Sequence, residues 1–345
     1  MVDTVCVTGA SGYIAAHIVK DLLEQGYEVR GTVRSNPEKY DYLTSLPGAN
    51  ERLTLVEGEL LTEGSYDEAV SGCDYVIHVA SPYRINVKDP QTDLVDPALK
   101  GTLNVLRSCQ KAGSIKRVVL TSSGAAITDE AETGKLFSED DWNEKSTLQR
   151  NPYSYSKVKA EKAAWDFIEK EKPSFDLVVI NPTFVTGPSL GPGLNSSPTI
   201  LRDMMVGGYP AIMSFEFSFV DVRDVAVAHR LAMENKKASG RYICANETRS
   251  VRQIVELLKA EGYSGYKLPV LDLTSKFGNR LVWLLSFAQP RDTGTFMRLA
   301  VGKESRYDNS KIKRDLGMEF LSVEQSILET VEDLLKWGHL DRRTT

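Results

Sequence analysis

Cysteine and histidine are scarce in this sequence of 345 residues, which contains four of each. The cysteines stand far apart and form no C-x-x-C pair, so the pattern predicts neither a metal site nor a disulfide framework. We interpret them as buried thiols of a protein in a reducing compartment. They are Cys6, Cys73, Cys109 and Cys244.

Long hydrophobic runs and an excess of positive charge are also absent. The most apolar segment of the later chain, Leu281–Ala288, is far too short to cross a bilayer. The first apolar run, Thr4–Thr8, begins so early that it leaves no room for a signal or transit peptide. The net charge of -5 gives no basic surface for nucleic acid or an anionic membrane. We therefore expect a cytoplasmic protein that binds neither nucleic acid nor membrane.

The composition is otherwise that of an ordinary globular protein, with 41% hydrophobic and 26% charged residues. A chain of this length suits one large domain or two closely joined ones. No internal repeat, low-complexity run or flexible linker is visible.

The first 33 residues read as a β-α-β unit. The apolar run Thr4–Thr8 meets a glycine-rich turn, a helical pattern of apolar residues follows, Gly26 ends it, and Tyr27–Val33 forms a second apolar run. The turn contains Gly9 and Gly12, with Ala15 where a third glycine often stands. This context predicts dinucleotide binding.

Each small residue of the turn has a physical purpose in such a site. Gly9 permits the tight turn, Gly12 lets a diphosphate approach the backbone, and Ala15 lets helix and strand pack closely. Amides at the start of the helix then bind the diphosphate, and Ser11 adds a hydroxyl.

Basic residues follow the second strand, where the choice between NAD and NADP is usually made. Arg34 stands at its end and Lys39 follows five residues later. An acidic residue here would receive ribose hydroxyls, whereas Arg offers a planar fork of donors to a 2′-phosphate. The sequence therefore predicts NADP(H), with Arg34 as the firmer contact and Lys39 as the looser one.

The alternation of strands and helices continues to about residue 180, which predicts an α/β fold with a doubly wound parallel sheet of Rossmann type. Ligands then bind at the carboxyl ends of the strands. Glu59 and Leu60 lie at such an end, where a side chain can meet the adenine edge. The expected strands are Arg52–Glu57, Asp74–Ala80, Arg117–Thr121 and Asp176–Ile180, and the expected helices are Ser65–Ser71 and Val95–Ala112.

The strict alternation breaks after residue 181. The stretch Phe184–Pro198 is dense in Gly, Pro and Ser and reads as an irregular segment over the pocket. We expect residues 1–180 to form the nucleotide-binding domain that carries the catalytic groups. Residues 181–345 are expected to form a smaller, mainly substrate-binding lobe, with segments that return to the main sheet. The later expected elements are a strand and helix within Phe217–Met233, a strand at Gly240–Ala245, and helices at Val251–Leu258 and Glu324–Trp337.

Three other features lie between the fourth and sixth strands. His78 is interpreted as a satisfied strand histidine rather than a catalytic base. The fifth strand ends in Ser122 and Ser123, which places hydroxyls where the crevice opens, although a turn or helix cap also explains them. The acidic stretch Thr128–Ser146, here called the acidic excursion, suits a surface loop more than the core.

The spacing Tyr-x-x-x-Lys occurs twice and overlaps, as Tyr153 with Lys157 and as Tyr155 with Lys159. Residues four apart lie on one helix face, and a cation beside a phenol lowers a pKa that starts at about 10. Each residue of a helix is turned by about 100° from the one before it. Lys157 and several apolar residues then fall within roughly 60° of Tyr153, whereas Tyr155 and Lys159 point to solvent. We therefore predict a chemical role for Tyr153 and Lys157 and none for Tyr155. The apolar residues are Ala160, Ala164, Phe167 and Ile168.

Several blocks in order make the chain resemble the extended short-chain dehydrogenase/reductase superfamily. Within it, the sequence is similar to the branch of dihydroflavonol 4-reductase, cinnamoyl-CoA reductase and the yeast-type methylglyoxal and ketone reductases. The blocks cover nearly the whole chain and read VTGASGYIAA, TVR, VIHVASP, TSS, YSYSKVKAEKAAW, NPTFVTGP, FVDVRDVAVAH, GRYICAN and SRYDNSKIKRDLG.

The resemblance implies a catalytic set of Ser123, Tyr153 and Lys157, and it suggests that Asn104 supports a proton relay. Glu59 stands where an aspartate is usual at the adenine contact. Gly124–Ala126 stands where plant flavonoid reductases carry residues tied to their own substrates, so a flavonoid substrate does not follow. The implied cofactor contacts are Gly9, Ser11, Gly12, Tyr13, Ile14, Arg34, Lys39, Leu60, Ala80, Pro182 and Ser197, besides the catalytic tyrosine and lysine.

The expected activity is reduction of a ketone or aldehyde by hydride transfer from NADPH. Two other activities of the superfamily stay open, a nucleotide-sugar epimerase or dehydratase and a hydroxysteroid-type dehydrogenase. An inactive nucleotide-binding scaffold is a third alternative. The expected partner is a small-molecule carbonyl substrate, and the chain is expected to be a monomer or homodimer.

Overall fold

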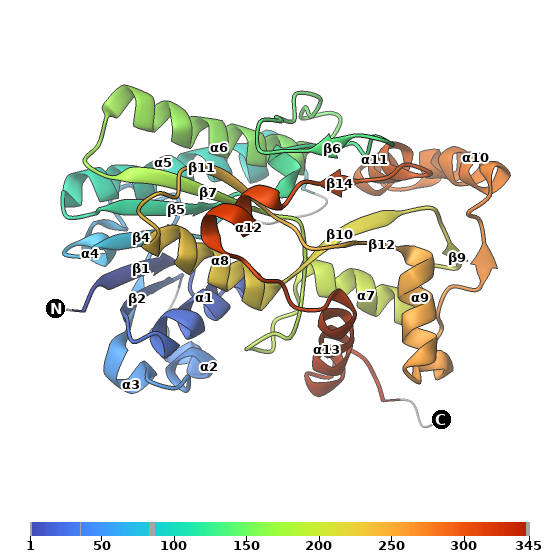
Figure 1. The fold of residues 1–345 in the computed structure, drawn as a ribbon, viewed down its shortest axis with the longest axis horizontal. Coiled ribbons are helices and arrows are strands. Elements are labelled where there is room, and N and C mark those ends of the chain that lie inside the picture. Colours follow the sequence, from blue (N-terminus) through green and yellow to red (C-terminus); the bar gives the residue numbers. More distant parts are fainter. Residues whose placement is uncertain (1, 35, 83–86, 343–345) are drawn as a thin grey trace.

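A parallel sheet of seven strands forms the centre of the molecule (Figure 1). The computed structural model describes residues 2–34, 36–82 and 87–342. The strand order is β11-β7-β5-β4-β1-β2-β3, and every pairing is parallel. The strands are β1 (Thr4–Thr8), β2 (Glu28–Val33), β3 (Leu53–Glu57), β4 (Tyr75–His78), β5 (Arg117–Thr121), β7 (Asp176–Pro182) and β11 (Gly240–Cys244).

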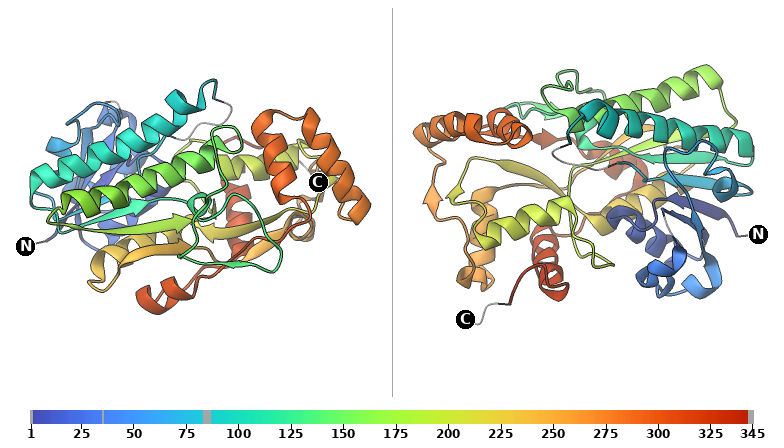
Figure 2. Two further views of the ribbon diagram at one scale, coloured as in Figure 1. Left: turned by 90° about the horizontal axis from the view of Figure 1, so that it is seen from above. Right: turned by 180° about the vertical axis from the view of Figure 1, so that it is seen from behind.

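Helices cover both faces of this sheet, as Figures 1 and 2 show. On one face α1 (Tyr13–Glu24) packs against α8 (Val222–Glu234), and on the other α5 (Asp96–Ala112) packs against α6 (Pro152–Glu171). The predicted Rossmann-type, doubly wound sheet is therefore confirmed. Although it comes late in the chain, β11 joins this sheet at its edge beside β7.

Local sequence explains where α6, the helix with both tyrosine–lysine pairs, begins and ends. The side chain of Asn151 accepts a hydrogen bond from the backbone N–H of Ser154 at 3.1 Å. Pro152 occupies the first helical position, where its missing N–H costs nothing. Lys172 ends the helix in the left-handed conformation at φ 46°. A cap and a proline thus fix where the first turn, with Tyr153, starts.

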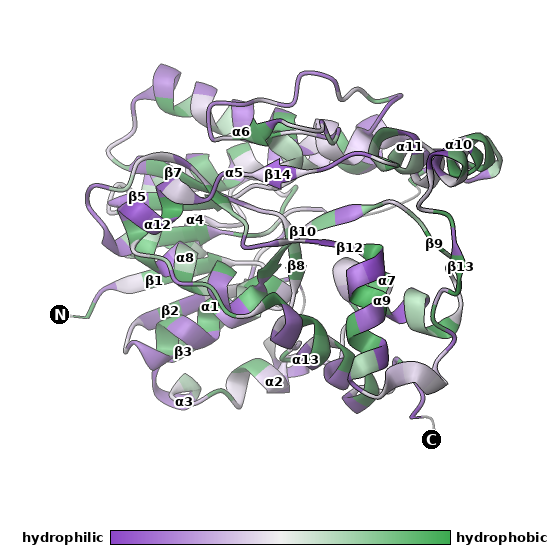
Figure 3. Cartoon of the chain, turned by 45° about the vertical axis from the view of Figure 1, so that its right-hand side comes forward, coloured by the Kyte–Doolittle hydropathy of each residue, from purple (hydrophilic) through white to green (hydrophobic). Residues whose placement is uncertain are grey.

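The second lobe has its own apolar core and a three-stranded sheet in the order β12-β10-β8. Figure 3 shows hydrophobic residues concentrated along α10 and α11 at its outer edge, where Phe277 and Phe287 are exposed. Among the described residues, no helix is both long enough and apolar enough to span a membrane. The elements of this lobe are β8 (Phe184–Thr186), α7 (Ser196–Val206), β9 (Ala211–Ile212), β10 (Glu216–Asp221), β12 (Thr248–Ser250), α9 (Val251–Ala260), β13 (Leu271–Asp272), α10 (Lys276–Leu285), α11 (Arg291–Ala300) and α13 (Val323–Lys336).

Two short strands lie where irregular chain was predicted. Within Phe184–Pro198, β8 pairs with β10 through Val185 and Val220. Within the acidic excursion, β6 (Leu136–Phe137) pairs with β14 (Arg306–Tyr307). Both pairings join distant segments, so local composition does not predict them. The remaining short elements are α2 (Asp41–Thr44), α3 (Ala49–Arg52), α4 (Asp67–Val70) and α12 (Ser310–Leu316).

The four cysteines are free and buried, as predicted.

The closing helix α13 holds the segment after β8 against the nucleotide-binding half. Thr330 accepts a hydrogen bond from the backbone N–H of Gly187 at 2.7 Å, and Asp333 accepts one from the N–H of Ser189 at 2.8 Å. From the other side, the hydroxyl of Tyr13 donates to the carbonyl oxygen of Gly187 at 2.6 Å. Residues 187–189 are thus fixed between the first and last helices.

We expect Thr330→Val to lower the free energy of unfolding by about 1–3 kcal/mol, because it leaves the buried N–H of Gly187 without an acceptor. Thr330→Ser keeps the acceptor and loses only a methyl group, so its loss should be smaller. Urea unfolding of both variants checks the prediction, and equal losses would contradict it.

Candidate active site

The structure brings the predicted site residues to one edge of the main sheet. Because all seven strands are parallel, the turns that follow their carboxyl ends meet there. Those turns and the start of α1 carry Gly9, Ser11, Gly12, Tyr13, Ile14, Arg34, Lys39, Glu59, Leu60, Ala80 and Ser123, whereas Pro182 ends β7, Ser197 lies in α7, and Tyr153 and Lys157 lie in α6.

The turn between β1 and α1 requires glycine at its first position. Gly9 has φ +68°, and a Cβ placed on it would lie 3.1 Å from the Cα of Ala80. The N–H of Gly12 donates to the carbonyl oxygen of Gly9 at 2.8 Å, which closes the turn. A side chain at position 9 would strain the backbone and push against the turn after β4.

The start of α1 fits the phosphates of a dinucleotide. No side chain caps this helix, so the amides of its first turn point outward from Gly12, an exposed residue. Nearby, the carbonyl oxygen of Ser11 accepts a hydrogen bond from the hydroxyl of Tyr42 at 2.7 Å. Arg34 and Lys39 are both exposed beyond β2, where their charges suit a phosphate.

Beyond β3, Glu59 is exposed and Leu60 packs on α5. A Cβ on Gly101 of that helix would lie 2.3 Å from Cγ of Leu60, so glycine is needed for this contact.

The side chain of Asn104, for which the resemblance suggested a role in a proton relay, is bonded to the loop after β3. Its amide donates to the carbonyl oxygens of Leu60 at 3.2 Å and Thr62 at 2.8 Å, and its oxygen accepts from the N–H of Gly64 at 3.1 Å. These bonds fix the loop after β3. The relay role of Asn104 stays a prediction beside this loop-holding role.

The structure separates the two tyrosine–lysine pairs of α6. Lys157 is only 8% exposed, and its Nζ donates to the hydroxyl of Ser81 at 3.0 Å. The same Nζ lies 5.7 Å from the ring centroid of Tyr153. Lys159 is exposed and lies over the ring of Tyr155 at 5.2 Å. The predicted orientation of the two faces is confirmed.

Burial changes the titration of two groups near this edge. It lowers the pKa of Lys157 to about 8, because removing the ammonium from water disfavours its charged form. It also lowers the pKa of His78 to about 3, so that this ring is neutral. His78 shares a hydrogen bond of 2.7 Å with the hydroxyl of Thr8, which confirms its interpretation as a satisfied strand histidine.

Ser123 lies two residues after the end of β5 in extended backbone, at φ -162° and ψ 153°. Its hydroxyl oxygen accepts a hydrogen bond from the N–H of Ala125 at 3.1 Å, so its proton is directed elsewhere and can be donated. The side-chain amide of Asn181, at the end of β7, donates to the carbonyl oxygen of Ser123 at 3.2 Å.

Residues outside the predicted set also contribute to this edge. Ser81 contacts Lys157, and Glu161 lies one helical turn beyond that lysine. The carboxylate of Glu161 accepts a hydrogen bond from Ser122 and pairs with Arg241. Helical spacing was the available signal, since Glu161 falls about 80° from Tyr153 on α6, just outside the face assigned to the pair.

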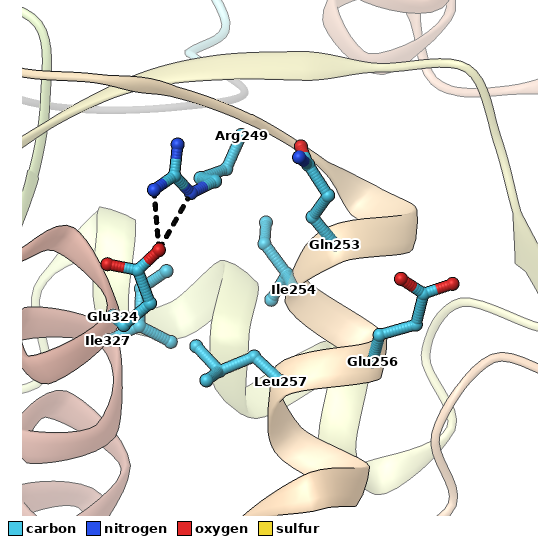
Figure 4. A pocket seen from close by; sticks show the side chains of 7 residues that line it. All are labelled: Arg249, Gln253, Ile254, Glu256, Leu257, Glu324 and Ile327. Carbon is cyan, nitrogen blue, oxygen red and sulfur yellow. Dashed lines mark hydrogen bonds and ion pairs between the residues drawn. The ribbon is translucent and has the colours of Figure 1, made fainter.

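A surface cavity of about 400 Å³ lies between α9 and α13, away from the predicted residues (Figure 4). Ile254, Leu257 and Ile327 line its apolar side, and Arg249 bonds to Glu324 across it. A second cavity of about 310 Å³ lies beside Trp142 and Arg241. Neither contains a residue of the predicted site.

Comparisons with known proteins show which chains are similar over nearly the whole length. A cinnamoyl-CoA reductase from Medicago truncatula is 41% identical over 343 residues, which cover 96% of this chain and 95% of the relative. Tetraketide alpha-pyrone reductase 1 from Arabidopsis thaliana is 37% identical over 345 residues, which cover 97% of this chain and 96% of the relative. The crystal structure of a yeast methylglyoxal/isovaleraldehyde reductase complexed with NADPH has a TM-score of 0.81 at 30% identity, covering 97% of this chain and 99% of the yeast chain.

Residues 5–245 match a family described as the NAD dependent epimerase/dehydratase family, within the extended short-chain dehydrogenases/reductases. That match spans more than half of the chain and includes the glycine turn, both tyrosine–lysine pairs of α6 and the strand ends that meet around them. The resemblance drawn from the sequence is therefore confirmed, and the chain belongs to this family.

Proposed function

We propose that the protein is an NADPH-dependent reductase that transfers hydride to the carbonyl carbon of a ketone or aldehyde. The observation that carries this proposal is the buried ammonium of Lys157 beside Tyr153, on the edge of the sheet that also holds the glycine turn. The relatives are reductases, and the yeast structure contains NADPH, which supports the same cofactor here.

The residues at the edge fit NADPH. Amides at the start of α1 suit the diphosphate, and Arg34 suits the 2′-phosphate with Lys39 nearby. In this proposal Glu59 and Leu60 contact the adenine, and Ala80, Pro182 and Ser197 contact the remainder of the cofactor. When bound, NADPH supplies the hydride.

The proton comes from Tyr153 in this proposal. Its phenol donates to the substrate oxygen as negative charge develops there. Lys157 is protonated at neutral pH, since burial leaves its pKa at about 8. Its positive charge favours the phenolate and lowers the pKa of Tyr153 toward the working pH. The same ammonium binds the nicotinamide ribose hydroxyls.

Ser123 donates a second hydrogen bond to the same oxygen. Its acceptor side is used by the N–H of Ala125, which leaves the hydroxyl proton for the substrate. Two donors on one oxygen stabilise the charge that develops in the transition state.

A nucleotide-sugar epimerase or dehydratase would use a similar tyrosine and lysine but regenerate its cofactor in each cycle. Arg34, an exposed cation at the end of β2, favours NADPH over the NAD that is usual in those enzymes. Net consumption of NADPH therefore separates the proposed reductase from this alternative.

We expect the full chain to oxidise NADPH in the presence of at least one carbonyl compound. The measurement follows NADPH absorbance with a panel of aryl ketones, α-dicarbonyls, aldehydes, flavonoids and acyl-CoA thioesters, each also tested with NADH. Absence of turnover across the panel would contradict the proposed function.

Tyr153→Phe should abolish turnover of the best substrate and leave NADPH affinity nearly intact, because only the phenolic proton is removed. Tyr155→Phe is the matched control on the same helix and should retain activity. Steady-state kinetics and NADPH fluorescence titration measure the two quantities, and substantial turnover by Tyr153→Phe, or equal losses in both variants, would contradict the assignment.

Lys157→Met should stabilise the cofactor-free protein at neutral pH. The pKa of Lys157 falls from the ordinary 10.5 to about 8 on folding, so the unfolded chain binds more protons between these values and stability rises with pH through this window. At about 1.4 kcal/mol per pKa unit, the penalty removed at pH 7 is up to about 3 kcal/mol.

The advantage of Lys157→Met should shrink as the pH rises from about 8 toward 10.5. Denaturant unfolding at several pH values measures it. Lys159→Met, at an exposed position of the same helix, should show no such pH-dependent gap, and a constant gap in Lys157→Met would argue against a desolvated ammonium.

A further inference from the structure

A buried carboxylate of α6 joins the ends of β5 and β7 at the catalytic edge to an arginine of β11. Glu161 has a fully buried side chain, and its Oε2 accepts hydrogen bonds from the hydroxyl of Ser122 at 2.5 Å and from the amide of Asn181 at 2.9 Å. Its Oε1 accepts from Nε of Arg241 at 2.6 Å. One side chain of α6 thus holds residues at the ends of β5 and β7 and near the start of β11.

Arg241 carries the same network out to the acidic excursion. Its Nη1 donates to the carbonyl oxygens of Glu139 at 3.0 Å and Asp141 at 2.7 Å. Its guanidinium also lies 3.9 Å from the ring centroid of Trp142. The planar fork of the guanidinium spreads its donors widely enough to serve a carboxylate and two carbonyls together, whereas the donors of a lysine all leave one nitrogen atom.

We propose that Glu161 and Arg241 are positioning residues that fix the Ser122–Ser123 turn against α6 and tie it to the acidic excursion. The inference rests on the proposed reductase function, because Ser123 has a catalytic role only there. Neither residue contacts the predicted reacting groups directly, so each acts through the serine turn.

The geometry explains why this network controls Ser123. Glu161 is four residues from Lys157 on the same rigid helix, and Ser122 is the direct neighbour of Ser123. Asn181 uses one amide to reach both Glu161 and the carbonyl oxygen of Ser123. The donor on the turn and the cation on the helix therefore keep a fixed relation, and a shift of about 1 Å between such groups can cost about 100-fold in rate.

The opposite end of the same strands offers a matched control. Arg117, at the start of β5, binds Asp176 at the start of β7 through Nε at 2.6 Å and Nη2 at 2.8 Å. It also donates to the carbonyl oxygens of Ala232 and Asn235. Both arginines are mostly buried and hold a carboxylate and two carbonyls, but the partner of Arg117 is the exposed Asp176 at the start of β7, whereas the partner of Arg241 is Glu161, which contacts the ends of β5 and β7.

The test compares Arg241→Lys with Arg117→Lys in the full chain, using the best carbonyl substrate of the panel. We expect Arg241→Lys and Glu161→Gln to lower kcat by about 10- to 100-fold, with NADPH affinity unchanged by fluorescence titration. Arg117→Lys should lose thermal stability without losing kcat. If Arg241 had only a structural role, Arg241→Lys and Arg117→Lys would change kcat and thermal stability alike.

If Arg241→Lys or Glu161→Gln fails to fold, Ser122→Ala still tests the inference. It removes only the hydroxyl that Glu161 accepts from, and it should lower kcat while NADPH affinity stays unchanged. Normal kcat in Arg241→Lys, or in Ser122→Ala where the others do not fold, overturns the inference and leaves the reductase proposal standing. A wild-type protein without turnover on the whole panel overturns the reductase proposal, and the inference with it.

Discussion

The proposed active site, at the carboxyl edge of the main sheet, depends on one ammonium group that is kept out of water. Lys157 is buried on α6, and desolvation is the cause of its lowered pKa. Such a charge is costly to bury, so its surroundings must hold it firmly. Ser81 accepts its hydrogen bond, the ring of Tyr153 lies beside it, and β4 and α6 hold these groups in place. The retained charge is what can lower the pKa of a phenol.

The parallel arrangement of the strands explains why these groups lie close together. Because the seven strands are parallel, a glycine turn, basic residues, a serine turn and Asn181 all lie at one edge of the sheet. Segments of the later chain also contact α1. The hydrogen bonds of Thr330 and Asp333 hold residues 187–189, which Tyr13 also contacts, so the last helix of the sequence is linked to the first.

Local patterns sufficed for much of this structure. Glycines between a strand and a helix predict the nucleotide turn. Helical spacing alone separates Lys157 from Lys159, because one face of α6 is apolar. Local patterns did not predict the contacts between segments that are distant in the sequence. The strand at Phe184–Thr186 forms only by pairing with β10, and the bonds by which Asn104 holds a loop were not predicted because its partners lie some 40 residues earlier. Glu161 was missed because its partner Arg241 comes 80 residues later.

The pairing of Glu161 with Arg241 also bears on how substrate choice and rate are related. In the proposed reductase we predict that the acidic excursion forms part of the wall of the substrate pocket, and two of its carbonyl oxygens are bound by Arg241. That arginine contacts the carboxylate that accepts from Ser122, next to Ser123. A sequence change that moves the excursion is therefore expected to move the serine turn as well. Under this proposal, substrate preference and transition-state stabilisation are not independent, because both depend on one buried ion pair.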